Sequence, residues 1–389
     1  MFQSLRYLRY LVLLLALPLG GCGMFDWMSS EDEATKPMKL GDFDAEVRLR
    51  RQWSVNVGSG EGKEYNRLDP VVAGARVYAA GNNGLVLAVN RETGRVEWRQ
   101  RLDYTLTGGV GVGGGLVLVG TVNARVIALD AQSGEVRWES AVSSEVLSAP
   151  ASDGRMVVVQ TVDGKLIGLD AQTGAQRWTY ETQVPALSLR GTSAPLIVQN
   201  YVVAALAGGT VVSVALDNGT LRWEERVAIP TGRSEIDRMV DIDGSLTLTN
   251  DNLLLAPSYQ GYLSAIDPVT GQTRWRVKES SYNGASSGFG NVYITSEGDI
   301  VKAYRVGQDA TVWSNDQMQR RRLSAPLGFS NYVAVGDADG YVHLLSQSDG
   351  RFVGRVKVDG DGIRADLHAQ GNTLYVFGNS GTLAAYQVE

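Results

Sequence analysis

Short apolar runs alternate with glycine-rich polar turns along most of the chain, and the alternation returns about every 40 residues. The clearest unit is Gly164–Trp178 (GKLIGLDAQTGAQRW): a glycine turn, an apolar strand, an Asp, a Gly four residues later and a Trp four residues beyond that. Close copies occupy Gly84–Trp98, Ala124–Trp138 and Gly261–Trp275. This pattern predicts a strand, a tight turn and a second strand in each copy.

Each turn has its own chemistry. The Asp carboxylate can accept hydrogen bonds from the turn amides, and the Gly supplies a positive φ. The Trp, which we expect to begin the next strand, recurs once per repeat and so suits an apolar wedge between neighbouring units. Four short strands in a period in the low forties are typical of β-propeller blades.

Eight wedge positions can be counted, at intervals of 38 to 52 residues. They are Trp53, Trp98, Trp138, Trp178, Trp223, Trp275, Trp313 and, with the Trp lost, Gly354. Three strands fit after Gly354 with no fourth, whereas Trp53 has no three strands before it. The sequence therefore predicts an all-β, eight-bladed β-propeller of four-stranded antiparallel blades over residues 47–389. The strand at Trp53 should pair with Ala384–Val388 and so close the last blade.

Smaller signals refine this picture. Ser-Ala-Pro at 148–150, 193–195 and 324–326 precedes apolar inner strands, where small residues suit a crowded central channel. Asn83-Gly84, Asp163-Gly164 and Asp339-Gly340 predict type I′ hairpins. The one candidate for a helical turn or two is Gln317–Arg322.

Residues 1–21 differ from the rest, with Arg6 and Arg9 before an apolar run, and predict a secretory signal too short to span a bilayer. Leu-Gly-Gly before Cys22, the single cysteine, resembles the lipobox of bacterial lipoproteins. That resemblance implies acylation of Cys22 and, because residue 23 is not Asp, an outer-membrane anchor facing the periplasm. The alternative is an ordinary signal with a chance cysteine. Residues 22–46 are polar and acidic and predict a flexible tether.

Composition limits the chemistry. The 46 glycines fit many hairpins, and the formal charge of −6, or −8 without the signal, disfavours nucleic acid and anionic lipid surfaces. Two histidines and one cysteine predict no metal site, and no catalytic motif or cofactor-binding loop is present. His343 is expected to be a packed blade residue, and Asp359–Gly362 a turn. The sequence leaves open a carboxylate pair in the central channel.

Three connections between blades are longer than the rest: Trp53 to Pro70, Trp178 to Pro195 and Trp223 to Leu246. The last two are consecutive and should emerge side by side on one face, where binding loops are common. They carry the candidate partner-binding residues Leu187, Leu189, Arg190, Asp241 and Asp243, apolar anchors beside charges. The alternative is that the two leucines pack beneath their own loop and Arg190 pairs internally with Asp241 or Asp243.

The repeat A-x-D-x-x-T-G-x-x-x-W resembles the tryptophan-docking motif of quinoprotein dehydrogenases. Those enzymes are longer and carry a vicinal disulfide, which a chain with one cysteine lacks. The whole mature chain is more similar to the propeller lipoprotein family of the outer-membrane β-barrel assembly (BAM) complex. That similarity rests on the lipobox, the acidic tether, the eight repeats and two local stretches. One is LSLRGTSAP at 187–195, and the other is SEIDR at 234–238 followed by DID at 241–243.

This family resemblance implies a non-catalytic scaffold without a cofactor or small-molecule substrate. Such a subunit would bind the POTRA domains of BamA and assist the folding and insertion of outer-membrane proteins. Two other classes stay open: a periplasmic ligand- or peptidoglycan-binding propeller, and a quinone-dependent dehydrogenase.

Overall fold

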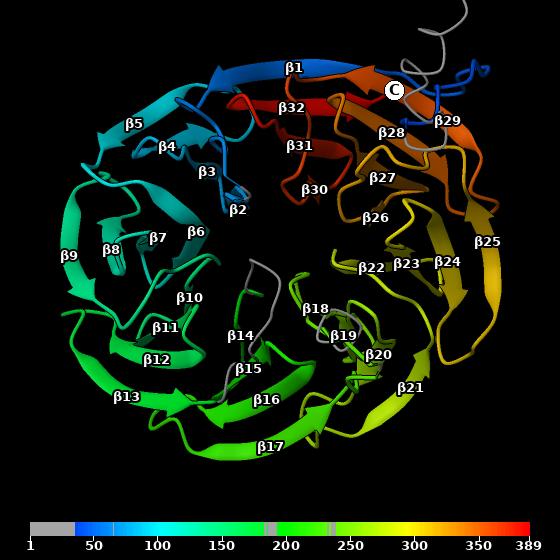
Figure 1. Cartoon of the computed structure of the whole chain (residues 1–389). Helices are drawn as coiled ribbons and strands as arrows, with labels where there is room; N and C mark the ends of the chain where they lie inside the picture. Colours follow the sequence, from blue (N-terminus) through cyan, green and yellow to red (C-terminus); the bar gives the residue numbers. More distant parts are fainter. Residues whose placement is uncertain (1–35, 65, 183–184, 186–192, 232, 235–238) are drawn as a thin grey trace, which may run out of the picture. The chain divides into compact units, whose positions relative to one another are not determined.

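The computed structural model describes residues 36–64, 66–182, 185, 193–231, 233–234 and 239–389. Within the compact unit Lys39–Glu389, eight four-stranded antiparallel sheets follow one another around a ring, with the first strand of each blade nearest the centre (Figure 1). The described residues contain strands and turns but no helix. The predicted eight-bladed β-propeller is therefore confirmed.

We number the blades in chain order. Blade 1 contains β2 (Val71–Ala73), β3 (Arg76–Ala80), β4 (Leu85–Asn90) and β5 (Val96–Arg101). Blade 2 contains β6 (Leu106–Gly113), β7 (Leu116–Thr121), β8 (Arg125–Asp130) and β9 (Val136–Ala141). Blade 3 contains β10 (Ala151–Ser152), β11 (Met156–Thr161), β12 (Lys165–Asp170) and β13 (Gln176–Glu181). Blade 4 contains β14 (Leu196–Val198), β15 (Tyr201–Leu206), β16 (Thr210–Ala215) and β17 (Leu221–Arg226).

The second half of the ring is built in the same way. Blade 5 contains β18 (Thr247–Leu248), β19 (Leu254–Pro257), β20 (Leu263–Ile266) and β21 (Thr273–Val277). Blade 6 contains β22 (Ala285–Gly288), β23 (Asn291–Thr295), β24 (Val301–Arg305) and β25 (Thr311–Asn315). Blade 7 contains β26 (Leu327–Phe329), β27 (Tyr332–Gly336), β28 (Tyr341–Ser346) and β29 (Phe352–Lys357). Blade 8 contains β30 (His368–Gln370), β31 (Thr373–Phe377), β32 (Thr382–Val388) and β1 (Leu49–Asn56).

The ring closes through β1, which is the outer strand of blade 8. It pairs antiparallel with β32, placing Leu49 opposite Val388 and Trp53 opposite Ala385. This is the predicted closure. Without β1, the β32 edge would present unpaired backbone groups, which invite association with other chains.

The repeated Trp and Gly fit together between blades. Six tryptophans (53, 98, 138, 178, 223 and 313) donate an Nε1 hydrogen bond of 2.8–3.2 Å to a backbone carbonyl in the next blade. Each of these rings also lies against the Gly of that blade's turn. At Gly174, for example, a Cβ would lie 2.7 Å from the Trp138 ring. The Gly is thus required for ring packing as well as for its φ of 72°. The Trp lies inside its strand, as Trp138 does in β9, rather than beginning it.

The Asp of each turn behaves as expected. The Oδ1 atom of Asp170 accepts hydrogen bonds from the Gln172 and Thr173 amides at 3.1 and 3.0 Å. Arg177 adds a bond of 2.7 Å to the Oδ2 atom. Chiefly because of this Arg177 bond, the pKa of Asp170 falls to about 2. The sequence pattern alone predicted the turn but did not identify this arginine as part of it.

Trp275 is the exception among the seven repeat tryptophans. Its Nε1 atom is buried and has no hydrogen-bond partner among the residues that the structure describes. The turn that should receive it, in blade 6, has Asp309 at the position of the Gly that packs against each of the other six tryptophan rings. The two features occur together because the docking geometry depends on that glycine.

This exception provides a matched test of the docking bond. Trp138→Phe keeps most of the apolar surface but removes the bond to the Ala171 carbonyl, so we expect a loss of about 1 kcal/mol. Trp275→Phe removes only an unpaired N–H and should cost less or even stabilise the protein. Urea unfolding measures both values. An equal loss in the two variants would show that the hydrogen bond contributes nothing.

Blade 7 replaces its missing Trp with the chain's own N-terminal segment. At Gly354 in β29, a Cβ would lie 3.1 Å from the Val47 side chain. The Glu46 and Val47 amides both donate to the Val353 carbonyl, at 2.9 and 3.1 Å. The Phe43 ring lies 5.5 Å from that of Phe352. Residues 43–47 therefore pack on the folded unit, although most of them were assigned to the tether.

Two local predictions were wrong. In the hairpins at Gly84, Gly164 and Gly340, only the glycine has positive φ, whereas a type I′ turn needs two such residues. The Gly164 amide bonds to the Thr161 carbonyl at 3.0 Å, which closes a turn that ends on a left-handed glycine. Residues 317–320 form turns rather than a helix, because Arg320 and Arg322 adopt φ of 61° and 52°.

Candidate functional site

One face of the ring carries all the connections between blades. A blade's four antiparallel strands alternate in direction, so these connections share a face with the hairpins between second and third strands. We call it the connection face. A cavity of about 730 Å³ opens at its centre, and all its lining residues come from these connections and hairpins. They include Arg67, Asp69, Asp243, Tyr259, Tyr282 and Arg322.

Polar contacts between non-adjacent blades cross the channel beside this cavity. Arg67, in the connection entering blade 1, donates through Nη2 to the Tyr282 carbonyl at 3.1 Å and to Asn283 Oδ1 at 2.8 Å, before blade 6. Ser245, before blade 5, donates to Asp366 Oδ2 at 2.7 Å, before blade 8. These bonds tie the loops around the cavity to one another.

Three carboxyl groups in this region have raised pKa values. Burial is the largest cause for each, and a neighbouring carboxylate adds to it. The pKa rises to about 8 for Glu61, beside Asp69, and to about 7 for Asp69, beside Asp366. It rises to about 7 for Asp243, beside Asp241. Arg67 opposes all three shifts without cancelling them.

The Glu61 shift predicts a pH-dependent variant. Its pKa is 4.5 ordinarily and about 8 in the fold, so the folded state binds the proton more tightly than the unfolded state does. The free energy of unfolding therefore falls as pH rises between these two values. Because glutamine carries no charge, Glu61→Gln should be more stable than wild type by at least ~1 kcal/mol at pH 8.5 but by little at pH 5. Urea unfolding at both pH values tests this, with the exposed Glu92→Gln as control. A pH-independent difference would contradict it.

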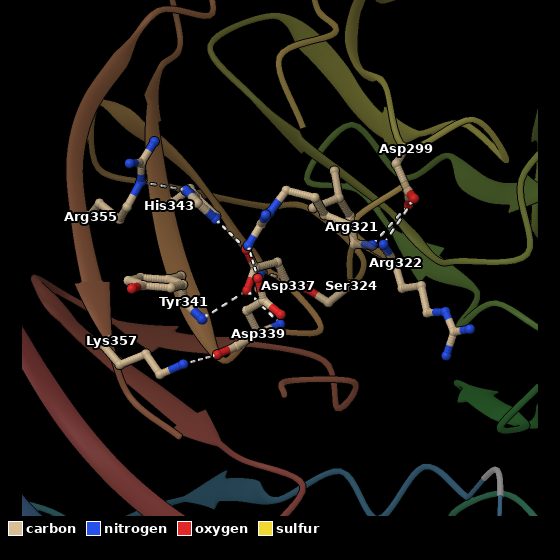
Figure 2. Close-up of polar contacts among 12 residues, drawn as sticks. Asp299, Arg321, Arg322, Ser324, Asp337, Asp339, Tyr341, His343, Arg355 and Lys357 are labelled. Carbon is tan, nitrogen blue, oxygen red and sulfur yellow. Dashed lines mark hydrogen bonds and ion pairs between the residues drawn. The ribbon is translucent and has the colours of Figure 1, made fainter. Parts of the chain in front are cut away.

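A polar chain in blade 7 supports the cavity wall (Figure 2). Arg321 donates to Asp337 Oδ2 at 2.8 Å, and His343 Nε2 lies 2.9 Å from the same oxygen. Because Arg355 Nε donates to His343 Nδ1 at 3.0 Å, the His343 proton must be on Nε2, facing Asp337. Burial lowers the pKa of His343, which keeps the ring neutral. His343 is fully buried, as predicted, but the chain itself was not foreseen.

A hairpin of blade 6, between β23 and β24, positions Arg322 at the cavity. Asp299 accepts bonds from the Arg322 and Leu323 amides at 2.9 and 2.8 Å, which holds Arg322 in its left-handed conformation. That conformation costs a non-glycine residue ~1 kcal/mol. Figure 2 shows the Arg322 side chain directed away from the Arg321–Asp337 pair.

The structure describes two of the five predicted partner-binding residues. Asp241 is buried: its carbonyl accepts the Tyr259 amide at 2.8 Å, and its Oδ1 atom accepts the Ile242 amide at 2.9 Å. Asp243 lines the cavity. Both therefore lie on the connection face. Leu187, Leu189 and Arg190 lie outside the described residues.

The remaining candidates have simple structural explanations. Asp359 Oδ1 accepts the Asp361 amide at 2.8 Å, and Ser380 bonds to Oδ2 at 2.5 Å, so this segment is a stabilised turn. No group of three potential metal ligands occurs among the described residues. Nor do these residues include a helix long and apolar enough to cross a bilayer. Cys22 lies outside them.

The fold and its docking tryptophans define a β-propeller of the pyrroloquinoline-quinone-like repeat class. A protein-family model described as "Outer membrane protein assembly factor BamB" matches residues 50–107 and 82–315. The factor of that name from Pseudomonas aeruginosa is 57% identical over 377 residues, covering 97% of this chain and 98% of the relative. The chain belongs to the BamB family of outer membrane protein assembly factors.

Solved structures agree with this assignment. BamB from Moraxella catarrhalis is 30% identical with a TM-score of 0.79, covering 87% of this chain and 99% of the other. A europium-containing methanol dehydrogenase gives a TM-score of 0.71 at 13% identity, covering 87% of this chain and 93% of the other. At that identity the likeness extends to the fold alone.

Proposed function

We propose that this chain is a non-catalytic scaffold subunit of the BAM complex that binds the POTRA domains of BamA and so assists the folding and insertion of outer-membrane proteins. The observation that carries the proposal is membership of the BamB family over nearly the whole chain. The position of Asp241 and Asp243 on the connection face supports the binding surface.

The two carboxylates would act in different ways. Asp241 is covered, and its carboxylate would help to hold its own loop in shape by accepting the Ile242 amide. Its backbone carbonyl accepts the Tyr259 amide of the blade 5 hairpin. Asp243 lies in the cavity wall, where its carboxyl group would contribute negative charge next to the connection between β17 and β18. Leu187, Leu189 and Arg190, from the preceding long connection, would supply the direct contacts. An interface of apolar anchors beside charged residues fits this division.

Partner capture tests the proposal in its natural setting. We expect the tagged lipoprotein, purified from detergent-solubilised membranes, to bring BamA with it. A quinone-dependent dehydrogenase would instead bind pyrroloquinoline quinone and show its absorption spectrum on reconstitution. Capture without BamA, or a stoichiometric quinone spectrum, would contradict the scaffold proposal.

We also propose that Cys22 carries the lipid that anchors the chain to the outer membrane, facing the periplasm. Several acyl chains at ~0.8 kcal/mol per buried methylene make a stable anchor. Cys22→Ser should therefore leave a soluble or unprocessed protein. Its melting temperature should equal that of wild type, because the chain has no other cysteine. Palmitate labelling of Cys22→Ser would contradict this prediction.

A further inference from the structure

We propose that the cavity on the connection face binds a short peptide with free termini, its N-terminal ammonium at Asp243 and its C-terminal carboxylate at Arg322. The proposal does not rest on BamA binding, since the residues found to line the cavity all belong to this chain. A volume of about 730 Å³ lies within the range of small-ligand sites.

The ammonium end follows from an unpaired acceptor. The Oδ1 atom of Asp243 is buried and has no hydrogen-bond partner among the described residues. Asp366 Oδ1, nearby in the cross-channel contacts, is also buried and has no partner in the described part of the chain. A buried carboxylate oxygen left unpaired is costly. An ammonium group provides three donors, which suits such oxygens.

Charge distinguishes this ligand from water. Arg67 lowers the pKa of Glu61, Asp69 and Asp243, but burial and the neighbouring carboxylates outweigh its effect. A water molecule would satisfy a hydrogen bond but would not favour the charged form of these carboxyl groups. A cationic group would also balance the charge, and the raised pKa values of Asp69 and Asp243 are consistent with a missing cation.

The carboxylate end follows from Arg322. Its guanidinium is exposed, lines the cavity and makes no hydrogen bond or ion pair with the described residues. The bond from the Arg322 amide to Asp299 fixes the backbone from which the Arg322 side chain extends, so less conformational entropy is lost when a ligand binds. Guanidinium groups bind carboxylates through paired N–H donors. Leu147, Leu323 and Ile363 provide apolar wall for the peptide's side chains.

Calorimetric titration of the soluble Cys22→Ser protein with trialanine and leucyl-alanyl-leucine tests the proposal. We expect saturable binding of at least one of them. N-acetylation of the peptide or Asp243→Asn should each weaken it at least tenfold, as should C-terminal amidation or Arg322→Gln. Asp251→Asn and Arg95→Gln, exposed substitutions on the opposite face, are matched controls and should bind as wild type does.

Circular dichroism melting confirms that each variant is folded. If neither peptide binds, if the acetylated and amidated peptides bind as well as the free ones, or if folded Asp243→Asn binds unchanged, the proposal is wrong. BamA capture by Asp243→Asn is measured separately. If Asp243→Asn loses peptide binding but still captures BamA, the peptide site is supported and the scaffold role is unaffected. If Asp243→Asn binds peptide normally but no longer captures BamA, the peptide site alone is overturned.

Discussion

Deleting residues 47–56 is expected to open the ring and lower the melting temperature by roughly 10 °C or more. The deletion removes β1, which pairs with β32 from Leu49 to Asn56. It also removes Trp53, whose ring packs on Gly94 and whose Nε1 bonds to the Arg91 carbonyl at 2.9 Å. Loss of one buried Trp alone costs 3–5 kcal/mol in typical cores, a shift of several degrees in a chain of this size.

Point variants separate closure from general damage. Trp53→Ala should reproduce much of the loss, whereas Gln52→Ala, at an exposed neighbour in the same strand, should change the melting temperature little. The deleted protein should also self-associate, because the β32 edge is uncovered. An unchanged melting curve in the deletion variant would contradict closure by β1.

Substitutions in the proposed partner surface should have the largest effect on function. We expect Leu187→Ala, Leu189→Ala, Arg190→Ala, or Asp241→Ala with Asp243→Ala, each to weaken BamA capture by at least ~1.4 kcal/mol, or tenfold. The physical reason is the loss of an apolar anchor, of a charged contact, or of the carboxylate that holds the second loop in shape.

The melting temperature distinguishes binding loss from unfolding. It should stay close to wild type in these variants. Asp241 and Asp243 lie in the connection between β17 and β18, outside the blade strands. Leu248→Ala and Asp251→Ala, both exposed at the opposite face of blade 5, are the matched controls and should capture BamA normally. Equal capture by all the variants, or a loss that merely follows unfolding, would place the interface elsewhere.

The repeating features of this fold are readable from the sequence because each one serves the same contact many times. Trp138 and Gly174 recur as a pair since the ring needs the space that a missing Cβ leaves. The closure at Trp53 was also predictable. The chain begins with a single strand and ends with three strands that lack a fourth, and pairing the two ends leaves no exposed sheet edge.

The cavity was harder to predict because it is built from single residues in different connections. Arg67 reaches Asn283 across the channel, a separation of 216 residues that no local pattern reports. One signal did exist: the connection from Trp53 to Pro70, which carries Arg67 and Asp69, is unusually long. The replacement of a Trp by Val47 at Gly354 is likewise a long-range contact, visible only in the fold.

Titration of purified BamA POTRA domains into the soluble Cys22→Ser protein tests the central claim most directly. The Cys22→Ser protein with no further substitution should show saturable one-to-one binding. Adding Arg190→Ala should weaken this binding at least tenfold, whereas adding Asp251→Ala should not. Absence of binding by the folded protein, or equal binding by all variants of Leu187, Leu189, Arg190, Asp241 and Asp243, would contradict the account.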